Sequence, residues 1–360
     1  LVPFSLFGTI FTYLVTRNVT KALSILMVDY SCALKLTMPV AVLSAINECS
    51  DYNITVKGGK YLEAVSNANI IVFDKTGTLT NAQPKLAKIV TFANRDKTEM
   101  LRLAACLEEH FPHSVANAVV NEAKSRGLNH EERHSKVEYI VAHGISSLVD
   151  GEKVVIGSYH FVFEDEKCVI PNGEEEKFNA IENEYSHLYM AINKELAAVI
   201  CIEDPIKENV KQTLEKLHQN GIEKIVMMTG DSERTAKAVA NKLGIDEYYA
   251  EVMPDDKAKF IKDMHKLGNK VIMVGDGIND SPALSEADAG IAISTGAAIA
   301  KEIADITISS DDLETLVTLK EISNLLMKRI SDNYRLIMSF TPPLIVLGVM
   351  GILPPTVSAF

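Results

Sequence analysis

A short apolar run that ends in a carboxylate constrains this chain more than any other feature. Residues 70–73 read IIVF, and the heptapeptide DKTGTLT follows at residues 74–80. The run predicts a buried parallel strand that delivers Asp74 to its carboxyl end, where open α/β sheets keep their active sites. A carboxylate there can attack a phosphorus atom and carry the phosphoryl group as an acyl phosphate. Gly77 permits a sharp turn, and Lys75, Thr76 and Thr78 supply charge and donors for phosphate oxygens.

Composition excludes some classes of protein. A formal net charge of −12, with no basic stretch interleaved with aromatic residues, disfavours a nucleic-acid partner. The hydrophobic share of 47% is high for a soluble protein of 360 residues, so a membrane component is expected. The five cysteines have no CxxC spacing, which favours reduced thiols facing a cytosol over a disulfide framework. They are Cys32, Cys49, Cys106, Cys168 and Cys201.

The apolar density lies at the two ends of the chain. Residues 1–16 carry no charge but are fewer than the roughly 20 that a spanning helix needs, whereas residues 22–46 are long enough. Residues 336–353 are also apolar, and Pro354-Pro355 begins a turn into a last segment. These patterns predict two hairpins of membrane helix, both incomplete, so the chain is interpreted as a fragment. The alternative, core helices of a soluble protein, is less favoured because one end pairs two such segments across a very short loop.

Between these ends, short apolar runs alternate with helical patterns that have a charged face. This alternation is typical of a parallel sheet built from βαβ units. Residues 83–198 have a different pattern, which predicts a separate helix and hairpin-like strands. We interpret them as a domain inserted into the sheet domain. The apolar runs assigned to the parallel sheet are residues 199–202, 225–228 and 271–274.

Two further strand ends and a lysine supply the other parts of a phosphoryl-transfer site. Thr229-Gly230-Asp231 offers a hydroxyl and backbone N–H groups at the start of a helix, which suits phosphate oxygens. Lys257 can neutralise phosphoryl charge. Asp276 and Asp280 lie on a glycine-rich turn, and two carboxylates in such a turn suit Mg²⁺, which prefers hard oxygen ligands.

The strings DKTGTLT, TGD and GDGIND together resemble the P-type ATPases, which belong to the haloacid-dehalogenase superfamily. The resemblance covers essentially the whole chain. It implies that Asp74 is the phosphorylated nucleophile and that Thr76 contributes to the phosphate and Mg²⁺ site. It also implies that Thr229 and Lys257 hold the phosphoryl group and that Asp276 joins Asp74 as an Mg²⁺ ligand. Asn279 and Asp280 complete the implied catalytic site.

The same resemblance implies an α/β fold with a defined domain order. A haloacid-dehalogenase-like Rossmannoid phosphorylation domain is split by an α+β nucleotide-binding domain and flanked by transmembrane α-helices. Transmembrane helices are expected in two segments, 1–48 and 323–360. In the first segment the first helix is truncated and the second carries a metal-site motif, and in the second segment the last helix is truncated. The phosphorylation domain is expected at 49–82 and 199–322, and the nucleotide-binding domain at 83–198.

A soluble phosphatase of the same superfamily, acting on a small phosphate ester, is the alternative interpretation. Such phosphatases resemble this chain at the nucleophile but carry a second aspartate two residues later, which serves as general acid and then as base. That position is Thr76 here. Without the base an acyl phosphate should persist, as an ion pump requires, and we therefore favour the pump.

The inserted domain resembles the nucleotide-binding domain of the heavy-metal-transporting P-type ATPases. The segment LEEHFPHSVA at residues 107–116 is similar to their "LE..SEHPLA" segment, which implies that Glu108 and His113 contact ATP. Ser114 replaces the proline of that segment. Gly144 and Gly157 match two glycines of the same family, where a close backbone approach to the nucleotide is expected.

The membrane segment resembles the family's cargo motif only in part. YSCALKLTMP at residues 30–39 is similar to "CPCALGLATP", keeping the second cysteine as Cys32, a thiolate that is expected to bind the transported metal. Tyr30 and Ser31 replace the first cysteine and the proline, so the motif does not identify the metal.

These features together predict ATP-driven export of a transition or heavy-metal cation through a phosphorylated Asp74, with ATP and Mg²⁺ as cofactors. The chain is expected to belong to a multi-pass protein of a bacterial cell membrane. The catalytic domains are expected to be cytoplasmic, because basic residues flank the central region. The expected partners are the lipid bilayer, the transported metal and the remainder of the pump, since no Thr-Gly-Glu tripeptide of an actuator domain occurs in these residues. The flanking basic residues are Lys57, Lys60, Lys328 and Arg329.

Overall fold

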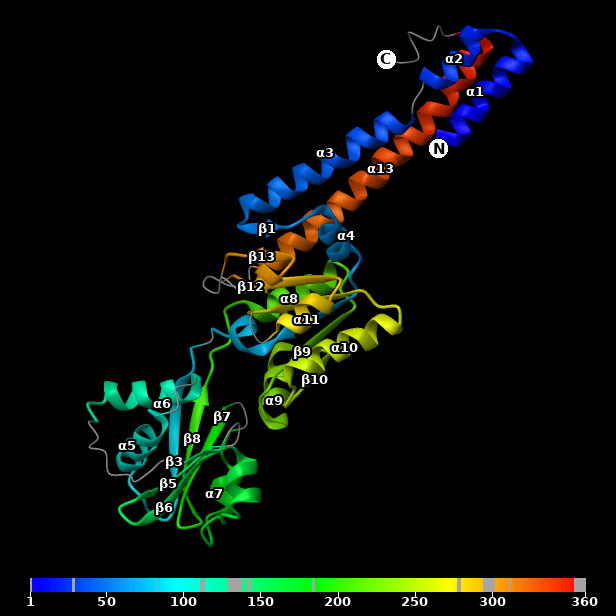
Figure 1. The fold of residues 1–360 in the computed structure, drawn as a ribbon. Coiled ribbons are helices and arrows are strands. Elements are labelled where there is room, and N and C mark those ends of the chain that lie inside the picture. The colour runs from blue at the N-terminus through cyan, green and yellow to red at the C-terminus, as the bar shows by residue number, and fades with distance from the viewer. Residues whose placement is uncertain are drawn as a thin grey trace.

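Two β-sheets and a long helical stalk make up the chain (Figure 1). The computed structural model describes residues 2–27, 30–81, 83–110, 114–128, 138–140, 144–182, 185–276, 280–293, 302–310 and 312–352.

The first sheet has seven strands in the order β1-β13-β12-β11-β2-β9-β10, parallel throughout except for β1 at one edge. Its strands are β1 (Ile54–Val56), β2 (Ile70–Asp74), β9 (Lys224–Met228), β10 (Glu247–Tyr249), β11 (Val271–Gly275), β12 (Ala289–Ile293) and β13 (Ile306–Ile308). The helices that accompany it are α4 (Gly59–Asn67), α8 (Val210–Gln219), α9 (Glu233–Leu243), α10 (Pro254–Lys266) and α11 (Ser281–Glu286).

The central strands are apolar at every position because both faces of this sheet are covered. Along β2 the side chains alternate: Ile71 and Phe73 join the core on one face, whereas Ile70 and Val72 join the core on the other. All five residues of β2 are buried, including Asp74. The predicted buried parallel strand is confirmed, and its apolar packing on both faces holds Asp74 at the carboxyl edge.

The second sheet has six antiparallel strands in the order β3-β8-β7-β6-β5-β4. Helices α5 and α6 cover one face, and a second apolar cluster around Phe92 and Phe178 fills the other. The strands are β3 (Lys85–Thr91), β4 (Glu138–Ile140), β5 (Gly144–Val149), β6 (Glu152–Gly157), β7 (Ser186–Ile192) and β8 (Glu195–Glu203). The helices are α5 (Lys97–Glu108), α6 (Ser114–Ser125) and α7 (Glu175–Asn179), with a short helical turn, η2 (His160–Asp165).

One strand assignment made from the sequence is wrong. Residues 199–202 were expected in the parallel sheet, but they belong to β8, which pairs with β3 and β7 in the antiparallel sheet. The seven inner residues of β8 are all buried because the strand is covered on both faces. A central antiparallel strand buried in this way has the same continuous apolar run as a parallel strand, so the sequence pattern could not separate the two. The other domain limits stay predictions.

Four helices form the stalk: α1 (Val2–Thr16), α2 (Val19–Met27), α3 (Tyr30–Asp51) and α13 (Thr315–Met350). α3 and α13 run side by side away from the parallel sheet, and α1 and α2 pack at the far end (Figure 1). The segment 22–46, expected to be long enough to cross a membrane, includes residues 28 and 29, which lie between α2 and α3 and outside the described residues, so this expectation stays a prediction. α3 extends past residue 46 because Ala41, Ala45 and Cys49, four residues apart, are buried in the core that the stalk shares with the parallel sheet.

Within the parts of the chain that the structure describes, no helix has both the length and the apolar character needed to cross a membrane. The end of the second expected hairpin, after Pro354, lies outside the described residues.

A buried lysine joins the stalk to the sheet domain. Lys320 of α13 is 2% exposed, and its ammonium donates to three backbone carbonyls at the end of α4. The acceptors are Val65 at 2.8 Å, Ser66 at 2.9 Å and Ala68 at 3.1 Å. Burial lowers the pKa of Lys320 to about 8, so the side chain stays mainly protonated at neutral pH. It satisfies the carbonyls that a helix end leaves without intrahelical partners.

We predict that Lys320→Met lowers the free energy of unfolding by about 2 kcal/mol, because three buried carbonyls lose a charged donor. Urea unfolding followed by circular dichroism measures the change. Lys328→Met is the matched control, since Lys328 is exposed on the same helix, and it should change stability by less than about 0.5 kcal/mol. Equal effects of the two substitutions would contradict the role given to Lys320.

Candidate functional site

The register of the parallel strands brings the predicted motifs to one edge of the sheet. Asp74 of β2 lies opposite Met228 of β9, so Thr229 directly follows the neighbouring strand end. On the other side of β2, Phe73 lies opposite Val274 of β11, so Asp276 follows that strand end. Three motifs far apart in the sequence therefore meet at the carboxyl ends of adjacent strands.

Lys257 lies at the centre of this edge between two carboxylates. Its Nζ is 2.5 Å from Asp74 Oδ1 and 2.7 Å from Asp280 Oδ1. Lys257 is 6% exposed, Asp74 8% and Asp280 1%. α10 supplies the lysine from its first turn and Asp280 precedes α11, so two helices and a strand position the three groups. One ammonium thus lies in direct contact with the predicted nucleophile.

The site holds more negative than positive charge. Burial and the Asp280 carboxylate raise the pKa of Asp74 to about 7, against the opposing effect of Lys257. Burial and Asp280 also raise the pKa of Asp276, although Lys257 and Lys207 oppose them. A single buried ammonium does not neutralise three carboxylates, and the site favours any ligand that adds positive charge.

The arrangement fits a magnesium ion. Carboxylate oxygens of Asp74, Asp276 and Asp280 lie within 4.8 Å of one another. Oδ2 of Asp280 is buried and has no hydrogen-bond partner among the described residues. Three hard oxygen donors and excess negative charge match the preferences of Mg²⁺.

Two glycines allow the carboxylates to approach the backbone. Gly77 has a φ of +75°, and a Cβ there would lie 2.7 Å from Asp276 Oδ2. A Cβ at Gly275 would collide with the Asp280 carboxylate. The turn after Asp74 and the end of β11 therefore need glycine for steric reasons.

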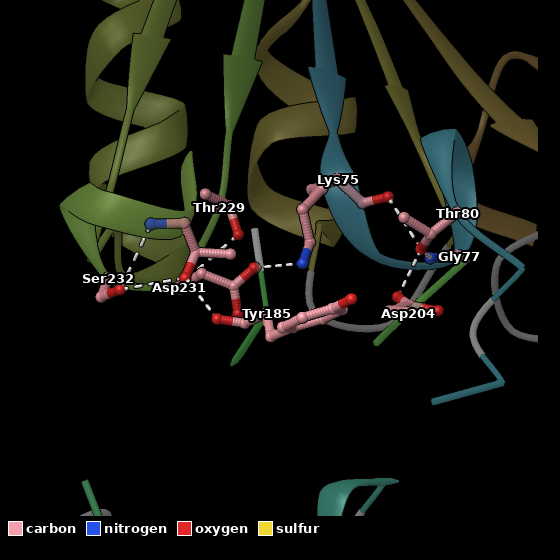
Figure 2. A network of polar contacts seen from close by, with 9 residues as sticks. Lys75, Gly77, Thr80, Tyr185, Asp204, Thr229, Asp231 and Ser232 are labelled. Atoms are coloured by element: carbon pink, nitrogen blue, oxygen red, sulfur yellow. Dashed lines mark hydrogen bonds and ion pairs between the residues drawn. The ribbon is translucent and has the colours of Figure 1, made fainter. Parts of the chain in front are cut away.

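A second layer of polar contacts holds the turn η1 (Lys75–Leu79) (Figure 2). Lys75 forms an ion pair with Asp231 of the TGD motif, and the two side chains point toward one another. The hydroxyl of Thr229, which is 2% exposed, accepts a hydrogen bond from the N–H of Asp231 at 3.1 Å. Lys75 was expected to face phosphate, but here it ties η1 to the loop after β9.

The last residue of the heptapeptide joins the turn to the chain that returns from the second sheet. The Thr80 hydroxyl donates to Asp204 Oδ2 at 2.5 Å and accepts from the N–H of Gly77 at 3.1 Å. Sequence reasoning gave no role to Thr80, although it lies inside the heptapeptide. By contrast, Thr76 is exposed at the start of the turn, so a hydroxyl rather than a carboxylate is present two residues after Asp74.

The other predicted residues lie elsewhere. Glu108 is 2% exposed at the end of α5, and Gly144 pairs with Gly157 across β5 and β6. A Cβ at Gly144 would collide with the ring of Phe161, so packing alone requires this glycine. The roles of these three residues in nucleotide binding stay predictions. His113 and Asn279 lie outside the described residues, as does the side chain of Cys32.

Comparisons with known proteins agree with this geometry. A family model for haloacid dehalogenase-like hydrolases matches residues 68–288. The chain is 34% identical, over 99% of its length and 49% of the relative's, to a zinc-exporting P-type ATPase of Mycobacterium marinum. It is 33% identical, over 99% of its length and 50% of the relative's, to a manganese-exporting P-type ATPase of Mycobacterium leprae.

A solved structure gives the same relationship in three dimensions. The crystal structure of a zinc-transporting PIB-type ATPase in the E2.Pi state matches with a TM-score of 0.76 and 27% identity, covering 99% of this chain and 58% of the other. The chain spans about half the length of the curated relatives it matches. It belongs to the haloacid dehalogenase-like hydrolases and contains the catalytic region of a heavy-metal P-type ATPase.

Proposed function

We propose that this chain drives export of a transition or heavy-metal cation by accepting a phosphoryl group from ATP on Asp74. One observation carries this proposal: the buried Asp74 carboxylate is in contact with Lys257. The residue two positions after the nucleophile is Thr76 rather than an aspartate, which favours a persistent phosphoenzyme. The printed names of the relatives, which export zinc and manganese, support the class of cargo.

The phosphorylation step moves one phosphoryl group from ATP to the chain. One carboxylate oxygen of Asp74 forms a bond to the γ-phosphorus, and the bond from that phosphorus to the β,γ-bridging oxygen breaks. ADP leaves with the electrons of that bond, and the chain keeps an aspartyl phosphate. The attack requires Asp74 to be ionised. Burial raises the pKa of Asp74 to about 7, and contact with the Lys257 ammonium opposes that rise and favours the ionised form.

The residues around Asp74 receive the phosphoryl oxygens. Lys257 already contacts Asp74 Oδ1 and can neutralise the charge that arrives there, while Thr229 offers its hydroxyl from the adjacent strand end. When bound among Asp74, Asp276 and Asp280, Mg²⁺ supplies further positive charge at this edge. The pair Lys75–Asp231 keeps η1 against the Thr229 loop, so the acceptor and its supports keep their relative positions.

The far end of the stalk supports the proposed membrane location, and the basic residues that flank the sheet domains favour a cytoplasmic location for them. Large apolar side chains are exposed at that end of the stalk on three helices, and soluble proteins rarely expose contiguous apolar surface of that extent. α2 and α13 also approach closely, since a Cβ at Gly348 would lie 2.9 Å from Ser24 Cβ, which is typical of small residues between membrane helices. The exposed apolar residues include Phe7, Ile10, Phe11 and Leu14 of α1, Leu36, Val40 and Leu43 of α3, and Leu336, Phe340 and Val346 of α13.

We predict that Asp74→Asn abolishes acid-stable labelling by ATP radiolabelled on the γ-phosphate, because the amide cannot attack phosphorus. Labelling of the unsubstituted chain should require Mg²⁺ and disappear with a chelator. Asp263→Asn is the control, since Asp263 is only partly buried and pairs with Lys266 away from the site, and it should keep full labelling. Label that persists in Asp74→Asn would refute the assignment of the nucleophile.

The phosphatase alternative is tested at position 76. Thr76→Asp restores the carboxylate that can act as a base, so the half-life of the phosphorylated chain after a cold ATP chase should fall at least roughly tenfold. Thr76→Asn has the same shape without the base and should keep the long half-life of the unsubstituted chain. An aspartyl phosphate of the unsubstituted chain that decays as fast as that of Thr76→Asp would favour the phosphatase.

A further inference from the structure

A cavity of about 370 Å³ lies where the antiparallel sheet faces the loop after β9. Ser158, Tyr159, His187 and Tyr189 form its wall on the side of the antiparallel sheet. The opposite wall comes from residues 231–235, the end of the TGD loop and the first turn of α9, together with Glu251. The two walls are joined by a hydrogen bond from the Thr235 hydroxyl to the backbone carbonyl of Tyr185 at 3.2 Å, beside Asp231 and Ser232 (Figure 2).

The cavity lies between the predicted nucleotide site and the surroundings of Asp74. On one wall, Ser158 directly follows Gly157, which the sequence assigns to the nucleotide site. On the other, Asp231 forms the ion pair with Lys75, the residue next to Asp74. A molecule that extends from the antiparallel sheet toward Asp74 can therefore pass through this cavity.

Arg234 is the cation of this cavity that lacks a partner. Its side chain is exposed, and it forms no ion pair or hydrogen bond among the described residues. The acidic neighbours Asp231 and Glu233 are already engaged, by Lys75 and by the hydroxyl of Tyr248 at 2.7 Å. The guanidinium is therefore available to a ligand that enters the cavity.

His187 adds no second positive charge on the facing wall. Burial, together with the charges of Arg234 and Lys88, lowers the pKa of His187 to about 4, so the imidazole is neutral at neutral pH. Its ring nitrogens lie 3.2 Å from the Tyr189 hydroxyl and 3.0 Å from the carbonyl of Glu182. The cavity thus combines one unpaired guanidinium with neutral hydroxyl and aromatic groups and with three carboxylates, of which Asp231 and Glu233 already have partners. The guanidinium suits the oxygens of a polyphosphate chain.

We propose that Arg234 is a positioning residue that binds the β- and γ-phosphates of ATP as the nucleotide spans this cavity. The proposal rests on the proposed function, because it assumes that ATP reaches Asp74 from the antiparallel sheet. A guanidinium binds phosphate oxygens through two parallel N–H groups, and such bidentate contacts orient a phosphate as well as hold it. Arg234 would direct the γ-phosphorus toward Asp74 without touching the reacting carboxylate.

The test is calorimetric binding of AMP, ADP and ATP to the full chain and to three variants. Arg234→Ala should weaken the binding of ADP and ATP about tenfold or more and change the binding of AMP less than about twofold, because only the first two carry a β-phosphate. Arg234→Lys should restore part of the loss, since it keeps the charge but not the bidentate geometry. Lys237→Ala is the matched control, because it removes an exposed charge from the same helix outside the cavity, and it should bind all three nucleotides normally.

The outcomes separate the inference from the function on which it rests. If the unsubstituted chain binds ATP and Arg234→Ala binds it equally well, the role of Arg234 is refuted and the proposed function stands. Equal losses for AMP and ATP also refute the role, since they indicate a structural effect or a contact with the nucleoside. If the unsubstituted chain binds no ATP, the proposed function itself fails.

Discussion

The contact of one buried ammonium with two buried carboxylates is the interaction on which the rest of this structure depends. Lys257 lies between Asp74 and Asp280, and removal of its charge would leave the carboxylates in a site where burial already raises the pKa of Asp74. The three groups carry a net negative charge that attracts a cation, and the ammonium attracts phosphoryl oxygens. Because the groups are buried, these electrostatic interactions are stronger than they would be in water. The fold holds this contact at the carboxyl edge of the parallel sheet.

Apolar packing provides that support. β2 is buried on both faces, and its register with β9 and β11 determines which residues follow each strand end. A shift of one residue in that register would separate Asp74 from the Thr229 loop and turn its carboxylate toward the other face of the sheet. The glycines at 77 and 275 then permit the carboxylates of Asp276 and Asp280 to lie against the backbone. The positions of the carboxylates at this edge therefore depend on the apolar packing of β2 and its neighbouring strands.

The sequence was sufficient for the strand that carries Asp74 and for the motifs around it, because each motif directly follows an apolar run. It was not sufficient for contacts between distant segments. Lys257 lies 183 residues from Asp74, and only the fold shows that it also contacts Asp280. The pairing of Lys75 with Asp231 and the cavity beside Arg234 depend on how loops and domains are placed. β8 was assigned to the wrong sheet because full burial erases the alternation that marks an antiparallel strand.

The residue that becomes phosphorylated tests the role of Asp74 most directly. After brief incubation with ATP and Mg²⁺, reduction of the chain with borohydride converts an aspartyl phosphate to homoserine, which peptide mass spectrometry detects as a change at one position. Homoserine is expected at position 74 and nowhere else in the chain. Phosphate that survives on a serine, threonine or histidine, with an unmodified Asp74, would contradict that role.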